Sequence, residues 1–270
     1  MNALTPILAS TRAAVDRRRT ARPLDVVQAD AERAASERAA AQGGQRSFAA
    51  ALAAPGLAVI AEHKRRSPSA GLIRDGLALE DVVRAYERAG ARALSVLTEE
   101  ASFAGSLADL TAARAATELP VLRKDFVVDP YQVPEALAAG ADAILLIVAA
   151  LDPATLSELH GAATALGLDV LVEVHDAAEL EIAVATGARI IGINNRDLTT
   201  LKVDTGRTFE LLEQIPAGGL IVAESGFRTR AELEALAAAG VDAVLVGEAL
   251  MRAPDIEAAC RELTGVGIAA

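Results

Sequence analysis

Short apolar runs rich in β-branched residues recur along this chain, and they constrain its fold more than any other feature. Eight such runs begin at Leu57, Ala93, Val121, Ala143, Val170, Ile190, Leu220 and Ala243. Most are apolar throughout and do not alternate with polar residues, which is typical of strands buried on both faces of a parallel sheet. A parallel sheet needs helices to cover its faces, so the segments between the runs decide the architecture.

Those intervening segments have helical spacing. Residues 79–90 and 229–240 are rich in alanine and leucine, with apolar side chains three and four positions apart. Several segments end in glycine, at Gly90, Gly140, Gly187 and Gly240. Glycine suits the left-handed conformation that often ends a helix, and a strand candidate follows each of these glycines within a few residues. Strands and helices are therefore predicted to alternate.

Eight strand and helix units close most economically into a barrel. The length of 270 residues is close to the about 250 residues of a typical eightfold β/α barrel. A doubly wound open sheet is the alternative, although the first strand is not followed by Gly-x-Gly-x-x-Gly, which argues against its dinucleotide-binding versions. We predict an α/β fold, a single (β/α)8 TIM barrel over residues 57–270.

Residues 1–56 are predicted to form an N-terminal helical extension that caps the barrel, within one domain of residues 1–270. Helices are expected over residues 11–22 and 24–41, with a break at residues 42–45. Arg17, Arg18 and Arg19 are expected to form a solvated helix face, because charge runs are usually exposed.

Charge and composition exclude several function classes. A net charge of −11 and 3% aromatic residues argue against general binding to nucleic acid or to anionic membranes. An anionic ligand must therefore meet a local cluster of positive charge. Cys260 is the only cysteine, which excludes intrachain disulfides. With neither a signal peptide nor a bilayer-spanning run recognised, a cytoplasmic location is expected.

Polar residues stand where the predicted strands end, at the place where barrels of this kind build their active sites. Glu62 and Lys64 follow the first run and share a face, because strand side chains alternate. An acid beside a base there can bind anions or move protons, although for an isolated pair a surface salt bridge is the commoner explanation. The other polar strand ends are Lys124, Glu173, Asn194, Arg196, Glu224 and Ser225.

Alternation of side chains directs these groups toward one mouth. Converging charges in a partly dry site must pair with one another or with a charged ligand. The positive charge of Lys64 is expected to lower the pKa of Lys124, and desolvation is expected to raise the pKa of Glu173. Both shifts would suit proton transfer near neutral pH.

The last two strands end in glycine-containing turns, at Gly226 and at Gly247 with Glu248. Backbone N–H groups at such turns commonly bind phosphate, which favours a sugar-phosphate substrate. A metal site is not expected, because His63, His160 and His175 are scattered. A serine hydrolase is not expected either, because Ser225 lacks a Gly-x-Ser-x-Gly elbow.

These residues belong to motifs that resemble the indole-3-glycerol phosphate synthase family over essentially the whole chain. The motifs are residues 60–69, 95–98, 103–106, 122–126, 129–132, 172–174, 192–198 and 224–226. The resemblance implies a carboxy-lyase of tryptophan biosynthesis that needs no cofactor. Its reaction converts 1-(2-carboxyphenylamino)-1-deoxyribulose 5-phosphate to indole-3-glycerol phosphate, with release of CO2 and water.

The resemblance also implies roles for the residues at the mouth of the barrel. Lys124 would protonate the substrate carbonyl oxygen as the ring carbon attacks, and Glu173 would act as acid or base in the later dehydration. Lys64 would hold the anthranilate carboxylate and share acid duty. Glu62 and Asn194 would orient hydroxyls and lysines. Ser67, Arg196, Glu224 and Ser225 would complete the polar shell.

Phosphate would lie against the backbone of Gly226, Gly247 and Glu248. Some relatives carry serine in place of Glu248, so its carboxylate is expected to point away. Residues 65–76 form the predicted lid. The expected partner is the small-molecule substrate alone, with a monomer as the working expectation. A sugar-phosphate isomerase, a Schiff-base aldolase and a catalytically silent phosphate sensor are the alternatives on this fold.

Overall fold

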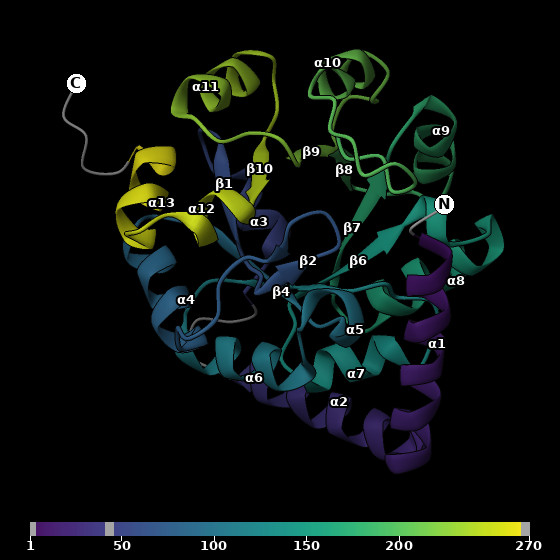
Figure 1. Ribbon diagram of the computed structural model, residues 1–270. Coiled ribbons are helices and arrows are strands. Elements are labelled where there is room, and N and C mark those ends of the chain that lie inside the picture. Colours follow the sequence, from purple (N-terminus) through teal and green to yellow (C-terminus); the bar gives the residue numbers. More distant parts are fainter. Residues whose placement is uncertain (1–3, 41–45, 266–270) are drawn as a thin grey trace.

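Eight parallel strands close into a barrel in the computed structural model, which describes residues 4–40 and 46–265. β1 pairs with β4 on one side and with β10 on the other, which leaves the sheet without an edge (Figure 1). The strands are β1 (Ala58–His63), β4 (Ala93–Leu97), β5 (Val121–Lys124), β6 (Ala143–Ile147), β7 (Asp169–Val174), β8 (Ile190–Asn194), β9 (Leu220–Glu224) and β10 (Ala243–Val246). The predicted barrel is confirmed, and the open sheet is excluded.

Helices alternate with the strands and surround the barrel (Figure 1). They are α4 (Leu79–Arg88), α6 (Leu107–Ala116), α7 (Gln132–Ala138), α8 (Pro153–Ala165), α9 (Ala177–Ala185), α10 (Gly206–Leu212), α11 (Arg230–Ala238) and α13 (Ile256–Thr264), with the shorter α5 (Glu100–Phe103), η1 (Val148–Ala150) and α12 (Glu248–Arg252). Gly90, Gly140, Gly187 and Gly240 have φ values of 86°, 101°, 83° and 92°. The predicted glycine caps are confirmed.

Each strand buries both of its faces, as the continuous apolar runs predicted. Ile60 lies in the cluster that fills the barrel, with Leu122, Leu171 and Val222. Its neighbour Val59 lies in the outer cluster, between the strands and the helices. Adjacent residues of one strand therefore stabilise two separate apolar layers, and the polar strand ends are left at the mouth.

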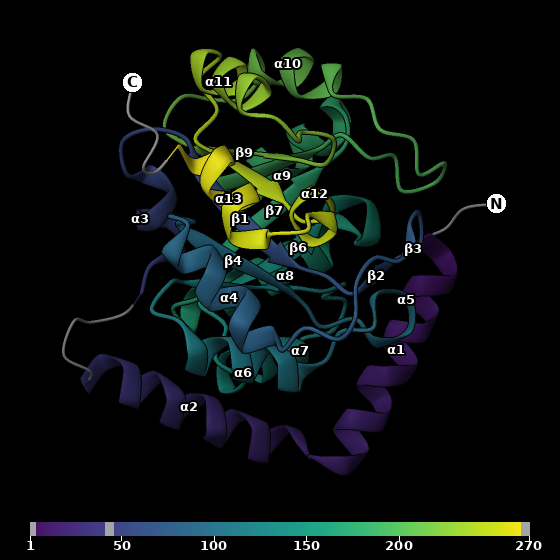
Figure 2. The same ribbon diagram turned by 60° about the vertical axis from the view of Figure 1, so that its left-hand side comes forward.

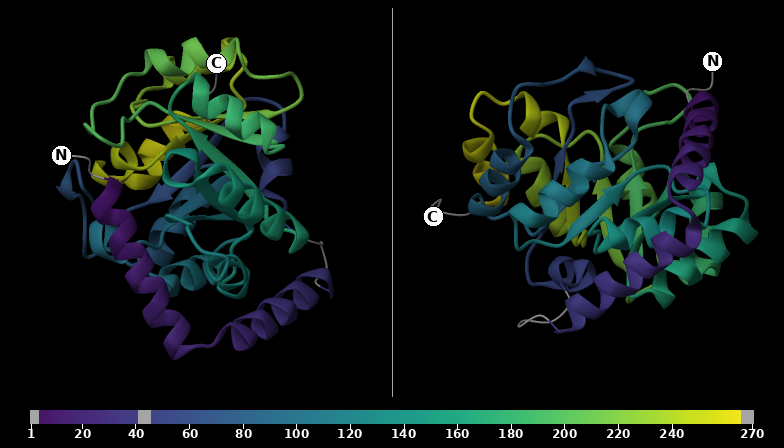
Figure 3. Two further views of the ribbon diagram at one scale, coloured as in Figure 1. Left: turned by 90° about the vertical axis from the view of Figure 1, so that its right-hand side faces the viewer. Right: turned by 90° about the horizontal axis from the view of Figure 1, so that it is seen from below.

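Three helices precede the barrel: α1 (Leu4–Ala21), α2 (Leu24–Ala40) and α3 (Phe48–Ala53). The two predicted helices are present, although the first begins at Leu4 and not at Thr11. The predicted break at residues 42–45 lies outside the described residues. Phe48 of α3 joins the inner cluster, so this helix covers the end of the barrel at which the strands begin. Figures 2 and 3 show α1 and α2 as a bent arm along one side of the barrel.

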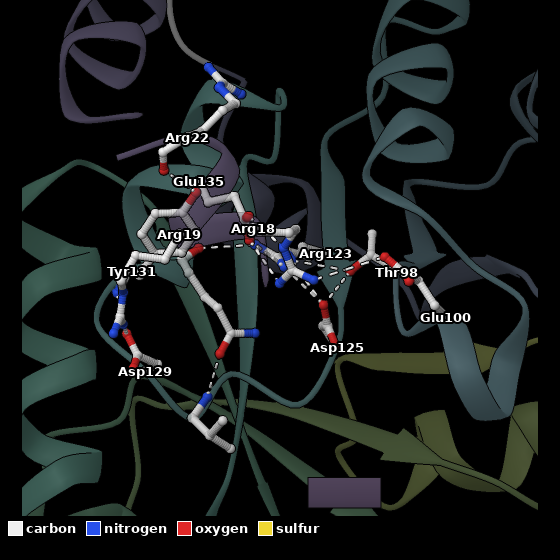
Figure 4. Close-up of polar contacts among 12 residues, drawn as sticks. Arg18, Arg19, Arg22, Thr98, Glu100, Arg123, Asp125, Asp129, Tyr131 and Glu135 are labelled. Atoms are coloured by element: carbon white, nitrogen blue, oxygen red, sulfur yellow. Dashed lines mark hydrogen bonds and ion pairs between the residues drawn. The ribbon is translucent and has the colours of Figure 1, made fainter. Parts of the chain in front are cut away.

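A buried ion network joins α1 to the barrel, and it corrects the prediction for Arg18 (Figure 4). Arg18 Nε donates to Glu135 Oε1 at 2.7 Å. Glu135 Oε2 accepts from Arg123 Nη2 at 3.0 Å, and that fully buried guanidinium also contacts Asp125 and Thr98 at 2.9 and 3.1 Å. The buried carboxylate of Glu135 needs partners, so Arg18, whose side chain is 22% exposed, is held against the barrel and is not a freely solvated side chain.

The neighbours of Arg18 differ from it. Arg17 is exposed, as predicted. Arg19 pairs with Asp129, and its guanidinium lies 5.5 Å from the centroid of the Tyr131 ring. Charge clustering in the sequence could not separate these residues, because their partners lie more than a hundred positions away along the chain.

Replacing Arg18 by Met should lower the free energy of unfolding by about 2 kcal/mol, because Glu135 loses a charge-assisted hydrogen bond in a partly buried place. The exposed Arg17→Met should stay within about 0.5 kcal/mol of wild type. Urea unfolding followed by circular dichroism measures both. Equal stability of the two variants would show that the contact contributes nothing.

Candidate active site

A pocket of about 240 Å³ opens at the carboxyl ends of the strands. Every residue predicted for the site except Ser67 lines it. These are Glu62, Lys64, Lys124, Glu173, Asn194, Arg196, Glu224, Ser225, Gly226, Gly247 and Glu248. The alternation argument therefore placed these groups at the correct end of the barrel, on strands that are far apart in the sequence.

Lys124 lies between two carboxylates at the centre of the pocket. Its Nζ is 3.1 Å from Glu173 Oε2 and 3.0 Å from Glu224 Oε2. Burial lowers the pKa of Lys124, but attraction to Glu173, Glu224 and Glu62 outweighs burial and raises this pKa above its usual range. The prediction that Lys64 would lower the pKa of Lys124 is wrong, because three carboxylates surround the ammonium.

The two carboxylates that hold Lys124 differ in ionisation. Burial raises the pKa of Glu173, but Lys124, His175 and Asn194 stabilise its anion and hold this pKa well below its usual range. The predicted upward shift at Glu173 is therefore wrong. Burial and repulsion from Glu173 and Glu62 raise the pKa of Glu224 to about 7, although Lys124 opposes the shift. Glu224 Oε1 is buried and makes no hydrogen bond to any described residue.

Glu62 and Lys64 form an ion pair on the opposite wall. Lys64 Nζ donates to Glu62 Oε1 at 2.7 Å, and Ser95 Oγ donates to Glu62 Oε2 at 3.2 Å. Burial raises the pKa of Glu62, but Lys64 and Lys124 bring it below its usual value. The pair is nearly buried, which argues against the surface salt bridge that the sequence left open.

One glycine on β8 and one directly after β10 make room for the carboxylates of Glu224 and Glu62. A Cβ at Gly247 would lie 2.5 Å from Glu62 Oε1, and a Cβ at Gly192 would collide with Glu224 Oε1. The sequence analysis did not assign Gly192 a role in the site. The sequence feature that could have identified Gly192 is a glycine inside an apolar strand, which often marks the close approach of another group.

Asn194 connects β8 to Glu173. Its Nδ2 donates to Glu173 Oε1 at 3.0 Å, and its Oδ1 accepts the backbone N–H of Arg196 at 3.0 Å. Ser67 lies on the hairpin of β2 (Arg66–Ser67) and β3 (Gly71–Leu72), within the segment predicted as a lid. It lines a smaller pocket of about 80 Å³ that shares Lys64 and Arg196 with the main one.

The turn after β9 has the backbone shape that glycine favours. Ser225 and Gly226 have φ values of 65° and 100°. Asn195, which the sequence analysis missed, donates from Nδ2 to the Ser225 carbonyl at 3.1 Å and holds this turn. The carboxylate of Glu248 pairs with Arg252 at 3.0 Å along α12, so only its backbone is left to face the pocket.

His175 is a further residue that the sequence analysis did not place at the site. Its Nε2 lies 3.4 Å from Glu173 Oε1, and its Nδ1 lies 2.9 Å from Glu179 Oε2. Burial lowers the pKa of His175, but the two carboxylates raise it to about 10. The sequence feature that could have identified His175 is its position two residues after Glu173, because this spacing places both side chains on one face of the strand.

Comparison with known proteins decides the family. The sequence model of indole-3-glycerol phosphate synthase matches residues 4–263. Indole-3-glycerol phosphate synthase 2 of Streptomyces coelicolor is 54% identical over 230 residues, which cover 85% of this chain and 89% of that protein. The indole-3-glycerol phosphate synthase of Aromatoleum aromaticum is 48% identical over 97% of this chain and 98% of that protein. The chain belongs to the indole-3-glycerol phosphate synthase family.

The family resemblance inferred from the motifs is confirmed. Members of this family are decarboxylating lyases of tryptophan biosynthesis that bind a phosphorylated small molecule, so the chain is an enzyme of that class. Among solved structures, a 3-hexulose-6-phosphate synthase aligns with a TM-score of 0.63 and 18% identity, over 77% of this chain and 99% of that one. At this identity the likeness shows the barrel fold alone.

The described residues, 4–40 and 46–265, offer neither a metal site nor a membrane span. They contain no group of three or more His, Cys, Asp or Glu side chains that could hold a metal ion. None of their helices has the length and apolar character that a membrane span requires.

Glu224 should make the stability of the protein depend on pH. Its pKa is about 7 in the folded protein against 4.5 in water, so between these values the folded state keeps a proton that the unfolded chain has lost. Stability therefore falls as pH rises from 5 to 8. Glu224→Gln cannot titrate, and its unfolding free energy relative to wild type should rise over this range by on the order of 2 kcal/mol.

Chemical unfolding at pH 5 and pH 8 measures this difference. The exposed Glu210→Gln is the matched control and should follow wild type at both pH values. If Glu224→Gln also keeps a constant offset from wild type, Glu224 does not titrate near neutral pH.

Proposed function

We propose that the charged mouth of this barrel converts 1-(2-carboxyphenylamino)-1-deoxyribulose 5-phosphate to indole-3-glycerol phosphate. The observation that supports this most is the Lys124 ammonium, held between Glu173 and Glu224 in the pocket. Ring closure needs a proton donor at the ketose carbonyl while the aromatic carbon attacks it. A charged lysine that is fixed in place and partly shielded from water suits that task.

The ionisation of Lys124 favours acid catalysis over covalent catalysis. A Schiff base requires a neutral amine, whereas the carboxylates around Lys124 raise its pKa and keep it protonated. Lys124 therefore donates a proton to the developing alkoxide. Loss of CO2 then restores the aromatic ring. The same ionisation argues against a Schiff-base aldolase, and borohydride with a ketose phosphate should leave Lys124 unmodified.

Glu173 acts as the base in the dehydration that follows. The sequence left acid and base roles open for this residue. Its low pKa means that it enters the reaction as a carboxylate, so it can remove a proton while Lys64 protonates the hydroxyl, which leaves as water. Asn194 fixes Glu173 Oε1 by a hydrogen bond of 3.0 Å, which orients the base toward the pocket.

The opposite wall binds the substrate. Lys64 attracts the anthranilate carboxylate and shares acid duty, and Glu62 orients Lys64 through their ion pair of 2.7 Å. Arg196, Ser225 and Ser67 complete the polar shell around the substrate, and Glu224 orients Lys124 from the side opposite Glu173.

The phosphate binds the backbone of Gly226, Gly247 and Glu248. The glycines support this placement, because neither turn has room for a Cβ: at Gly226 it would lie 2.6 Å from Thr205, and at Gly247 it would lie 2.5 Å from Glu62. Backbone N–H groups that are open on one side can approach phosphate oxygens closely.

We also propose a cytoplasmic monomer that needs no cofactor and does not act on nucleic acid. The net charge of −11 supports the last point. The contact of Arg18 with Glu135 supports treating residues 1–270 as one folding unit. Dialysis against EDTA should leave activity unchanged, and light scattering should give the mass of a single chain. Loss of activity on dialysis, or twice that mass, would overturn these points.

Replacing Lys124 by Met should reduce kcat by about 10³-fold, because the main proton donor is lost. The measurement is the rise of indole fluorescence after mixing with the carboxyphenylamino-deoxyribulose phosphate. Lys202→Met is the matched control, because Lys202 is exposed and does not line the pocket. A folded wild type that makes no product would refute the proposed function, and equal rates for both variants would refute the role of Lys124.

Gly226→Ala should raise KM about tenfold or more with a smaller change in kcat, because the new Cβ displaces the turn that binds phosphate. Gly240→Ala is the matched control. Its φ of 92° imposes similar backbone strain, but a Cβ there meets nothing within 4 Å. Steady-state kinetics and thermal unfolding should show that both variants lose stability and only Gly226→Ala loses affinity. Equal KM values would place the phosphate elsewhere.

A further inference from the structure

His175 lies directly behind the proposed base. It follows β7, two residues after Glu173, and its Nε2 is 3.4 Å from Glu173 Oε1. Its Nδ1 is 2.9 Å from Glu179 Oε2 in α9, and the same oxygen accepts the backbone N–H of His175 at 2.8 Å. The side chain of His175 is 10% exposed. Glu179 therefore holds the imidazole by a hydrogen bond at Nδ1, while Glu173 lies at ion-pair distance from Nε2, which makes no hydrogen bond to any described residue.

The two contacts determine which ring nitrogens of His175 carry protons. A neutral imidazole carries one N–H and one lone pair. If Nδ1 donates to Glu179, a neutral ring turns the Nε2 lone pair toward the oxygen of Glu173, and two acceptors repel each other. Only the imidazolium presents an N–H to both carboxylates. The pKa of about 10 agrees with this geometry.

Two carboxylates face the ring. Glu173 faces it from β7 and Glu179 faces it from α9. The short helix η1, which packs against both elements, consists of Val148, Ala149 and Ala150. His175 is not among the pocket-lining residues, whereas Glu173, Lys124 and Asn194 are. The ring therefore reaches the active site only through Glu173.

In the proposed reaction, Glu173 needs a second cation close to it, and His175 is in the position to supply that charge. Lys124 is the nearest cation to Glu173, at 3.1 Å, but Lys124 must engage the substrate carbonyl to act as the acid. A buried carboxylate that loses its cation tends to take up a proton, because burial favours the neutral form. A protonated Glu173 could not act as the base. A second cation that does not touch the substrate avoids this conflict.

We propose that His175, held by Glu179, is a positioning residue that orients Glu173 and keeps it ionised while Lys124 is engaged with the substrate. The inference rests on the proposed function, because it assigns His175 a task in the same reaction. It predicts that the ring stays an imidazolium throughout the pH range in which the enzyme works.

The test is the pH dependence of kcat for His175→Gln, which keeps an amide near Glu173 and removes the charge. We expect kcat to fall about tenfold to a hundredfold and KM to stay within about twofold. The acidic limb of the profile should move to higher pH by about one unit, because the pKa of Glu173 rises. His160→Gln, in α8 and away from the mouth, should match wild type in all three quantities.

Two further measurements keep the inference testable if His175→Gln folds poorly. Glu179→Gln should move the acidic limb in the same direction by a smaller amount. The ¹⁵N shifts of the histidine rings should show His175 as an imidazolium at pH 8 in the wild-type protein. A neutral ring at pH 8, or an acidic limb that neither variant moves, would overturn the inference. A wild type without synthase activity would instead refute the proposed function.

Discussion

The ammonium of Lys124 between Glu173 and Glu224 is the interaction on which the site depends. Without it, two carboxylates that are almost fully buried would face each other, and at least one would take up a proton. Two residues of β8 accommodate Lys124, Glu173 and Glu224. Gly192 leaves space for Glu224, and Asn194 fixes Glu173 by a hydrogen bond. The substrate therefore meets a preorganised set of charges, which costs little rearrangement when the reaction begins.

The strand that carries Lys124 is held from its other face. Arg123 points outward from β5 and joins Glu135, which in turn accepts from Arg18 of α1 (Figure 4). One strand thus carries the proposed proton donor, Lys124, on the inner side and a structural cation, Arg123, on the outer side. Through Glu135, α1 is therefore linked to β5, the strand that carries Lys124, and not only to the barrel surface.

Much of this arrangement could be predicted from the sequence, because it depends on local periodicity. The apolar runs located all eight strands, and alternation placed Glu62, Lys124 and Glu173 at one mouth. The ionisation states could not be predicted, since they depend on distances between strands. Lys64 follows β1, two barrel strands before β5 and Lys124, yet the carboxylates around Lys124 decide its pKa. His175 was missed for a different reason: both of its partners, Glu173 and Glu179, lie within four positions of it in the sequence, but the histidines were considered only as metal ligands.

The central claim is that Lys124 is a proton donor because the carboxylates hold it as an ammonium. The most direct measurement is an NMR titration of ¹⁵Nζ-labelled lysine, since Lys64, Lys124 and Lys202 are the only lysines of the chain. We predict that the Lys124 signal stays that of an ammonium above the pH at which a lysine side chain in water loses its proton, about 10.4. A Lys124 signal that titrates below that pH would contradict the claim.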